Sequence, residues 1–125
     1  MRCLIISLFL LINSTFAYSG GHITDAEKKE AIKCLGHYTA ITFIPANEVE
    51  AIQIEYALAS FKIAKAYLLN EKVKEDEINK GTIDELDKLI GQPFNTARNE
   101  ECNSFIYKLI PGSKADIEKM RGTLE

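Results

Sequence analysis

The 125 residues include no tryptophan and only two histidines, three cysteines and three prolines. A serine or cysteine nucleophile needs a histidine held by a third group, so two histidines leave little for that kind of catalysis. A zinc site needs about three or four cysteine, histidine or carboxylate ligands. No Gly-x-Ser-x-Gly, His-Glu-x-x-His or glycine-rich phosphate loop occurs. We therefore expect that the protein is not an enzyme and that it binds no metal ion and no cofactor.

The chain also lacks a run of basic residues. Its formal net charge is −3 at pH 7, and lysines alternate with acidic residues, as in residues 27–30. Nucleic acids and anionic membrane surfaces are bound by clustered lysine and arginine. We therefore expect no binding to nucleic acid or to anionic membrane surfaces and, after cleavage of the leader described below, no stable membrane insertion. We interpret the mixed charges as solvated helix faces.

One apolar segment stands near the beginning of the chain. A positive residue precedes the apolar residues 4–12, which are fewer than the ~20 that span a bilayer as a helix. Small residues follow, as at a signal-peptidase site. We predict cleavage after Ala17, or alternatively after Ser19. Residues 1–17 would then be a signal peptide and 18–125 an exported, periplasmic or secreted domain with a net charge of −4, because the leader contains one arginine and no acid.

A copper site at the new N-terminus depends on which cut is used. Cleavage after Ser19 would start the chain at residues 20–22, Gly-Gly-His. The free amine, two backbone amides and the His22 imidazole would suit Cu(II) or Ni(II). Cleavage after Ala17 places His22 fifth and removes the site. We expect the cut after Ala17, and thus only a polar leader before Thr24.

Two cysteines, Cys34 and Cys102, remain after removal of the leader. An isolated pair in an exported chain most simply forms one disulfide. This disulfide would close a loop of about 68 residues, for which the chain-entropy model gives roughly 4 kcal/mol of stabilisation. No Cys-x-x-Cys supports a redox role. His37 shares a helix face with Cys34, but the disulfide removes both sulfurs as metal ligands.

Strand signals are nearly absent, whereas helix signals are frequent. There is no Asn-Gly or Asp-Gly turn and no long alternation of apolar and polar residues. Capping boxes begin at Thr24 and Thr82, Gly91 is suited to a left-handed helix end, and Ser113 can cap a last helix. The predicted helices cover residues 25–43, about 48–72, 82–90, 96–109 and 114–121.

These helices predict an all-α fold, a compact bundle of four to five helices. One disulfide would tie the first helix to a late helix. The second helix has a broad apolar stripe that includes Ile52, Ala66 and Leu69, which predicts a central helix packed on more than one side. The polar residues 72–81 fit either a helical continuation or a loop.

The tyrosines and phenylalanines allow two interpretations. Their helical spacing fits core packing, but tyrosines also line grooves for a partner or a small apolar ligand, because one end of the side chain is apolar and the other polar. The absence of tryptophan removes one common anchor of protein interfaces. The aromatic residues concerned are Tyr38, Tyr56, Phe61, Tyr67, Phe94, Phe105 and Tyr107.

By elimination, we expect a non-enzymatic protein-binding module, most concretely an inhibitor or immunity-type protein that blocks an exported enzyme or toxin. A loop such as 70–80 or 91–95 would enter the cleft of the enzyme, and acidic loop residues would steer it toward a basic partner. Signal peptide, size, helices and cysteine count are similar to those of small periplasmic helical immunity proteins of bacterial secretion systems, a likeness that no motif carries. The alternatives are a carrier of a small apolar ligand and an accessory or chaperone factor of an envelope machine.

Overall fold

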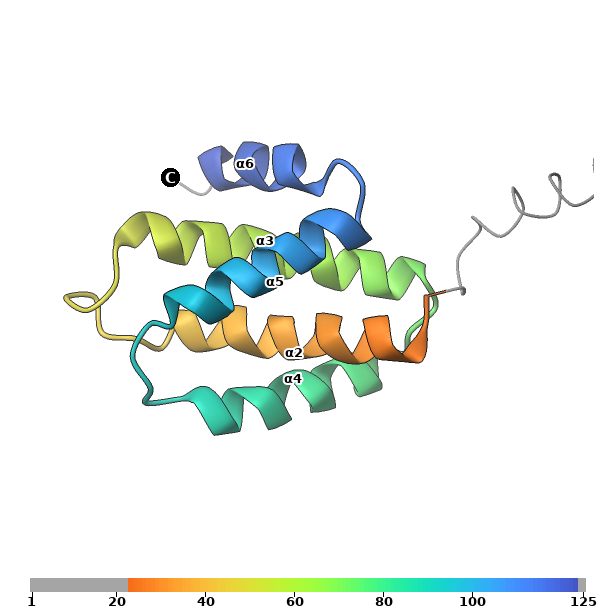
Figure 1. Cartoon of the computed structure of the whole chain (residues 1–125), viewed down its shortest axis with the longest axis horizontal. Coiled ribbons are helices and arrows are strands. Elements are labelled where there is room, and N and C mark those ends of the chain that lie inside the picture. The colour runs from red at the N-terminus through yellow and green to blue at the C-terminus, as the bar shows by residue number, and fades with distance from the viewer. Residues whose placement is uncertain (1–22, 124–125) are drawn as a thin grey trace, which may run out of the picture.

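The structure is a computed structural model and describes residues 23–123 (Figure 1). These residues form five helices and no strand, which confirms the predicted all-α bundle. None of the helices is both long and apolar enough to span a membrane. The predicted signal peptide, both cuts and His22 lie outside the described residues. The helices are α2 (Asp25–Ile41), α3 (Ala51–Asn70), α4 (Glu75–Leu89), α5 (Thr96–Leu109) and α6 (Ser113–Thr123).

Helix α2 is the centre of the bundle, with α3 along one side, α4 along the other and α5 crossing it (Figure 1). It buries residues in every turn after the first, among them Ala31, Leu35 and Tyr38. The prediction that the second helix is central is therefore wrong. Helix α3 does pack on two sides, against α2 and α6, but it leaves Ile52 and Leu69 exposed.

Helices α2 and α4 approach closely because each has a glycine at the contact. A β carbon built on Gly36 would lie 2.5 Å from the β carbon of Glu85, and one on Gly81 would lie 2.5 Å from Cγ2 of Ile32. Both distances are too short for carbon atoms in contact. A side chain at either glycine would therefore push the helices apart.

Helix α4 begins at Glu75, so residues 75–81 are helical and the predicted capping box at Thr82 is wrong. Three acidic residues in the first turn, 75–77, favour this start because they complement the helix dipole. Ile78 is fully buried and fixes the helix against the core. Thr82 lies inside α4 and is buried, with no hydrogen bond to its hydroxyl within the described part of the chain.

Short turns join the helices. Gly91, after α4, has the predicted left-handed conformation with φ of 88°. The predicted cap at Ser113 is wrong, because Ser113 is the first residue of α6 and is completely buried. Its hydroxyl donates to the carbonyl of Ile106 at 3.3 Å. Ser113 therefore links α6 to α5 rather than capping its own helix.

Candidate functional site

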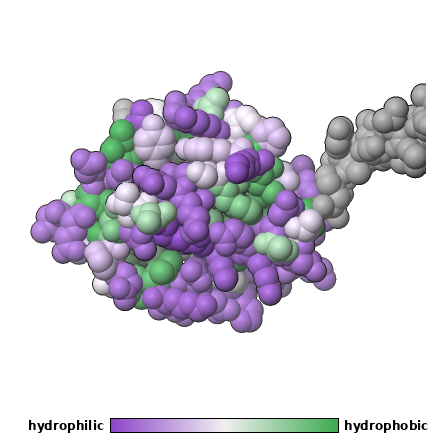
Figure 2. Space-filling view, viewed as in Figure 1, coloured by the Kyte–Doolittle hydropathy of each residue, from purple (hydrophilic) through white to green (hydrophobic). Residues whose placement is uncertain are grey.

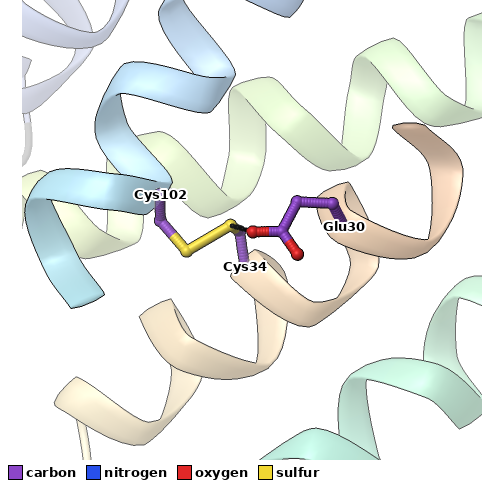
Figure 3. Close-up of side chains that lie close together, drawn as sticks. All are labelled: Glu30, Cys34 and Cys102. Atoms are coloured by element: carbon purple, nitrogen blue, oxygen red, sulfur yellow. Dashed lines mark hydrogen bonds between the residues drawn. A yellow bond between two sulfur atoms is a disulfide. The ribbon is translucent and has the colours of Figure 1, made fainter. Parts of the chain in front are cut away.

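Helix α5 is fastened across α2 by the predicted disulfide between Cys34 and Cys102. The two Cα atoms lie 5.5 Å apart, and both cysteines are fully buried. Figure 3 shows the bond running from the middle of α2 to α5. The disulfide places the first half of α5 at a defined position over α2, and this placement shapes the surface described below.

A half-buried ion pair lies beside the disulfide. Glu30, one turn before Cys34, points its carboxylate at the sulfur, with Oε2 3.8 Å from Sγ (Figure 3). The same oxygen accepts a hydrogen bond of 2.8 Å from Arg98 on α5, and Arg98 also pairs with Glu101 at 2.6 Å. The Glu30 carboxylate and the two sulfurs are close enough to hold a metal ion. The sulfurs are bonded to each other, however, and the carboxylate is bound to Arg98, so this cluster fastens the two helices.

Two further hydrogen bonds join α2 to α5. The ring of His37 donates from Nε2 to Oδ1 of Asn99 at 2.9 Å, and the hydroxyl of Tyr38 donates to Oδ1 of Asn103 at 2.9 Å. Burial lowers the pKa of His37, and the nearby Arg98 lowers it further. Burial also raises the pKa of Tyr38. Both side chains are therefore uncharged at neutral pH and act as buried anchors for α5.

One hollow lies on the side of α5 that faces α4. Its volume is about 490 Å³, and its walls come from α2, the end of α4 and the start of α5. We call it the His37 hollow. Its walls are mainly aliphatic and aromatic, with positive groups at two places. The residues that matter below are His37, Ile41, Ile44, Leu89, Phe94 and Arg98.

A second hollow, of about 420 Å³, lies on the other side of α5, against α3 and α6. We call it the tyrosine groove. It combines aromatic, apolar and acidic side chains, and Phe94 lines both hollows. The residues that matter below are Ile52, Tyr56, Phe94, Glu100, Tyr107 and Glu118. Of the two loops predicted to meet a partner, 91–95 lies between the hollows, whereas most of 70–80 is helical.

The tyrosine groove is negative. Glu100 and Glu118 are exposed, and neither pairs with a cation among residues 23–123. Burial raises the pKa of Tyr107, and the Glu118 carboxylate and Tyr56 raise it further. The carboxylate of Glu118 and the two phenol rings line the same groove. The groove thus presents two unpaired negative charges beside two aromatic rings.

The surface around the hollows carries apolar side chains. Phe43 and Ile90 are exposed in or next to the loops at the end of the bundle where α5 starts, and Ile52 is exposed beside the tyrosine groove. Figure 2 shows hydrophobic residues reaching this face in separate patches between hydrophilic ones. Protein interfaces likewise combine apolar residues at their centre with a polar rim.

Comparisons with known proteins identify no relative. No family model, curated protein or solved structure matches this chain. Sequence reasoning named the two cysteines, Tyr56 and Tyr107, but missed Glu30, Arg98 and the two asparagines of α5 that hold α2. Their signal was helical spacing: Arg98 and Asn99 lie four and three residues before Cys102, and Asn103 lies four residues after Asn99.

Proposed function

We propose that this chain is an exported helical module that binds another protein and acts as an inhibitor or immunity-type protein by blocking an exported enzyme or toxin. The observation that carries the proposal is the surface around the first half of α5, where two hollows meet at Phe94. Pockets of this kind accept side chains of a partner, and a few such anchors supply most of the binding energy of an interface.

The fastening of α5 supports this function. A disulfide, the ion pair of Glu30 with Arg98, and the hydrogen bonds of His37 and Tyr38 hold α5 in one place. A binding surface that is already ordered loses less conformational entropy when the partner docks. The polar side chains beneath α5 bind one another, which suits a rigid plug better than a centre that exchanges protons with a substrate.

A capture experiment tests the proposal. Immobilised residues 18–125 are incubated with exported proteins of the source organism, and any captured enzyme is assayed with increasing amounts of the chain. Two variants form a matched pair, because both positions are exposed isoleucines: Ile52→Ser beside the tyrosine groove, and Ile83→Ser on α4. We expect Ile83→Ser to capture like the wild type and Ile52→Ser to capture about tenfold less, the loss of an anchor worth ~1.4 kcal/mol.

Inhibition decides the functional part of the proposal. The captured enzyme or toxin should lose activity in proportion to the added chain and be fully blocked at one-to-one stoichiometry. Capture without inhibition would leave a binding module that is no inhibitor. Equal capture by the two variants would show that the surface around α5 is not the interface.

The volume of the His37 hollow favours one second candidate, a carrier of a small apolar ligand. Ligand pockets of proteins have roughly 300–1,000 Å³, and this hollow has about 490 Å³ with Ile41, Ile44 and Leu89 in its walls. Native mass spectrometry of the chain purified from its own host tests this function. A bound apolar molecule that Ile44→Ser releases, together with no captured protein, would favour the carrier over the inhibitor.

A further inference from the structure

We propose that the tyrosine groove receives a lysine or arginine side chain of the protein partner, so that the partner presents a basic residue at the centre of the interface. This inference rests on the proposed function and specifies the chemistry of the partner. It depends on three features of the groove: two aromatic rings, two carboxylates without a counter-ion and an apolar entrance.

The groove offers a contact for each part of a basic side chain. Ile52 and Phe94 offer apolar surface to the aliphatic stem, which lysine and arginine bury readily. Tyr56 and Tyr107 offer aromatic faces, which attract a cation held within about 6 Å of the ring centre. Glu100 and Glu118 supply the negative charge.

Cations of this chain already lie over both tyrosine rings. The guanidinium carbon of Arg121 lies 5.2 Å from the centre of the Tyr56 ring, and Nζ of Lys114 lies 5.8 Å from the centre of the Tyr107 ring. Arg121 also donates to Glu55 at 3.0 Å, so that carboxylate already has its cation. Both rings are therefore already in contact with a cation of this chain, but neither Arg121 nor Lys114 lines the groove itself.

Neither Glu100 nor Glu118 forms an ion pair within the described residues. The ion pairs there use other acids, such as Glu30 with Arg98 and Glu77 with Lys28. Lys114 precedes Glu118 by four residues on α6 and is the chain's own competitor for the groove. A partner cation would therefore gain two carboxylates that the fold leaves free, and the negative net charge of the domain would speed its approach.

A probe that carries only the proposed chemistry tests the inference without the partner. Residues 18–125 labelled with ¹⁵N are titrated with N-acetylarginine methylamide, and in parallel with N-acetylcitrulline methylamide, which has nearly the same shape and no charge. We expect the arginine probe to shift the backbone amide signals of Tyr56, Asn103 and Tyr107, to leave those of α4 unchanged, and the citrulline probe to bind more weakly.

Variants test whether the arginine probe binds in the tyrosine groove. The double variant Glu100→Gln with Glu118→Gln should bind the arginine probe about fivefold more weakly, as expected for two exposed charge pairs. Asp76→Asn with Asp87→Asn makes the same charge change on α4, which lies on the opposite side of α2 from α3 and α6 (Figure 1), and should bind like the wild type. Lys114→Gln removes the internal competitor and should bind about twofold more tightly.

Two results would overturn the inference and leave the proposed function standing. One is equal binding of the arginine and citrulline probes, or of the arginine probe to wild type and to Glu100→Gln with Glu118→Gln. The other is undiminished capture of the protein partner by that double variant. Loss of capture in the double variant, with retention in Asp76→Asn with Asp87→Asn, would support the inference directly.

Discussion

Lys72 is a lysine in a conformation that favours glycine. It follows α3 with φ of 72°, the one positive φ of a non-glycine residue among residues 23–123. The amide of Val73 donates to the carbonyl of Leu68, and that of Lys72 to the carbonyl of Leu69, each at 3.0 Å, which is the Schellman arrangement. The buried side chains of Val73 and Leu68 complete the motif. The left-handed position is thus required by the turn and not by the lysine side chain.

We predict that Lys72→Gly raises the free energy of unfolding by roughly 0.5–1 kcal/mol. Glycine removes the steric cost of the left-handed backbone, and its greater freedom in the unfolded chain offsets part of that gain. Urea denaturation measures the change. Lys72→Ala removes the same charge but keeps a β carbon, so it should show no gain, and an equal gain in both variants would mean that the charge is responsible.

His37 should make the protein less stable in acid. Burial lowers its pKa in the folded chain, and Arg98 acts in the same direction, although the hydrogen bond to Asn99 and the charge of Glu85 oppose them. As the pH falls below about 6.5, the unfolded chain takes up a proton at this residue before the folded chain does. The free energy of unfolding therefore falls with pH, from about 6.5 down to the lower pKa of the folded state.

Urea denaturation between about pH 7.5 and pH 5 measures this loss. His37→Gln keeps a side-chain amide that can donate to Asn99 but has no proton to take up. It should remove part of the pH dependence below about 6.5 while other titrating groups keep theirs. An identical slope in wild type and His37→Gln would show that this histidine is protonated as easily in the folded chain as in the unfolded one.

The disulfide could be predicted from the sequence because only two cysteines follow the predicted signal peptide, and a pair has one way to join. The surroundings of that bond could not. The partner of Glu30 is Arg98 and the partner of His37 is Asn99, more than sixty positions away in each case. Nothing local to either residue selects that partner. The crossing of α5 over α2 decides which side chains meet, and that crossing follows from packing of the whole bundle.

At the scale of helices, α2 and α4 depend on the absence of a side chain at Gly36. A β carbon there would meet Cβ and Cγ of Glu85 and the carbonyl oxygen of Thr82 at 2.5, 2.8 and 3.0 Å. We predict that Gly36→Ala lowers the free energy of unfolding by about 1–3 kcal/mol, the usual cost of overpacking, despite the better helix propensity of alanine. Thermal and urea denaturation measure it.

Gly122→Ala is the matched control for this prediction. Gly122 is also a helical glycine, and a β carbon on it would meet no atom within 4 Å. The substitution should leave stability unchanged or raise it by up to ~1 kcal/mol. If Gly36→Ala stabilised the protein as Gly122→Ala does, α2 and α4 would not lie as close at Gly36 as the structure shows.

Helix boundaries were predictable where a local signal and the packing agree. Thr24 forms the predicted capping box with Glu27, and α5 covers the predicted residues 96–109, with Asn95 as its cap. Thr82 and Glu85 show the same Thr-x-x-Glu pattern. Helix α4 nevertheless begins before Thr82, because Ile78 and Thr82 are buried and α4 packs against α2. A capping motif therefore marks a helix start only if the preceding turn has nothing to bury.

For the whole molecule, the position of α5 rests on few buried side chains. Only Cys102 and Ile106 of this helix are buried, whereas α2 buries residues in every turn after the first. Helix α5 is therefore held mainly by the disulfide and by polar contacts with α2. Because α5 forms a wall of both hollows, stability and binding should both depend on the disulfide, and a disulfide persists where conditions are oxidising.

We predict that Cys34→Ala with Cys102→Ala lowers the free energy of unfolding by about 4 kcal/mol, the chain-entropy value for cysteines 68 positions apart. A reductant should do the same to the wild type, and urea denaturation with and without reductant measures both.

Glu30→Gln is the control: it weakens the ion pair beside the bond, leaves Arg98 paired with Glu101, and should lower the free energy of unfolding by no more than ~1 kcal/mol. If the double alanine variant lost less than Glu30→Gln, polar contacts rather than the disulfide would hold α5. If it kept its fold but lost binding of the arginine probe, the disulfide would be shown to position the groove as well as to stabilise the bundle.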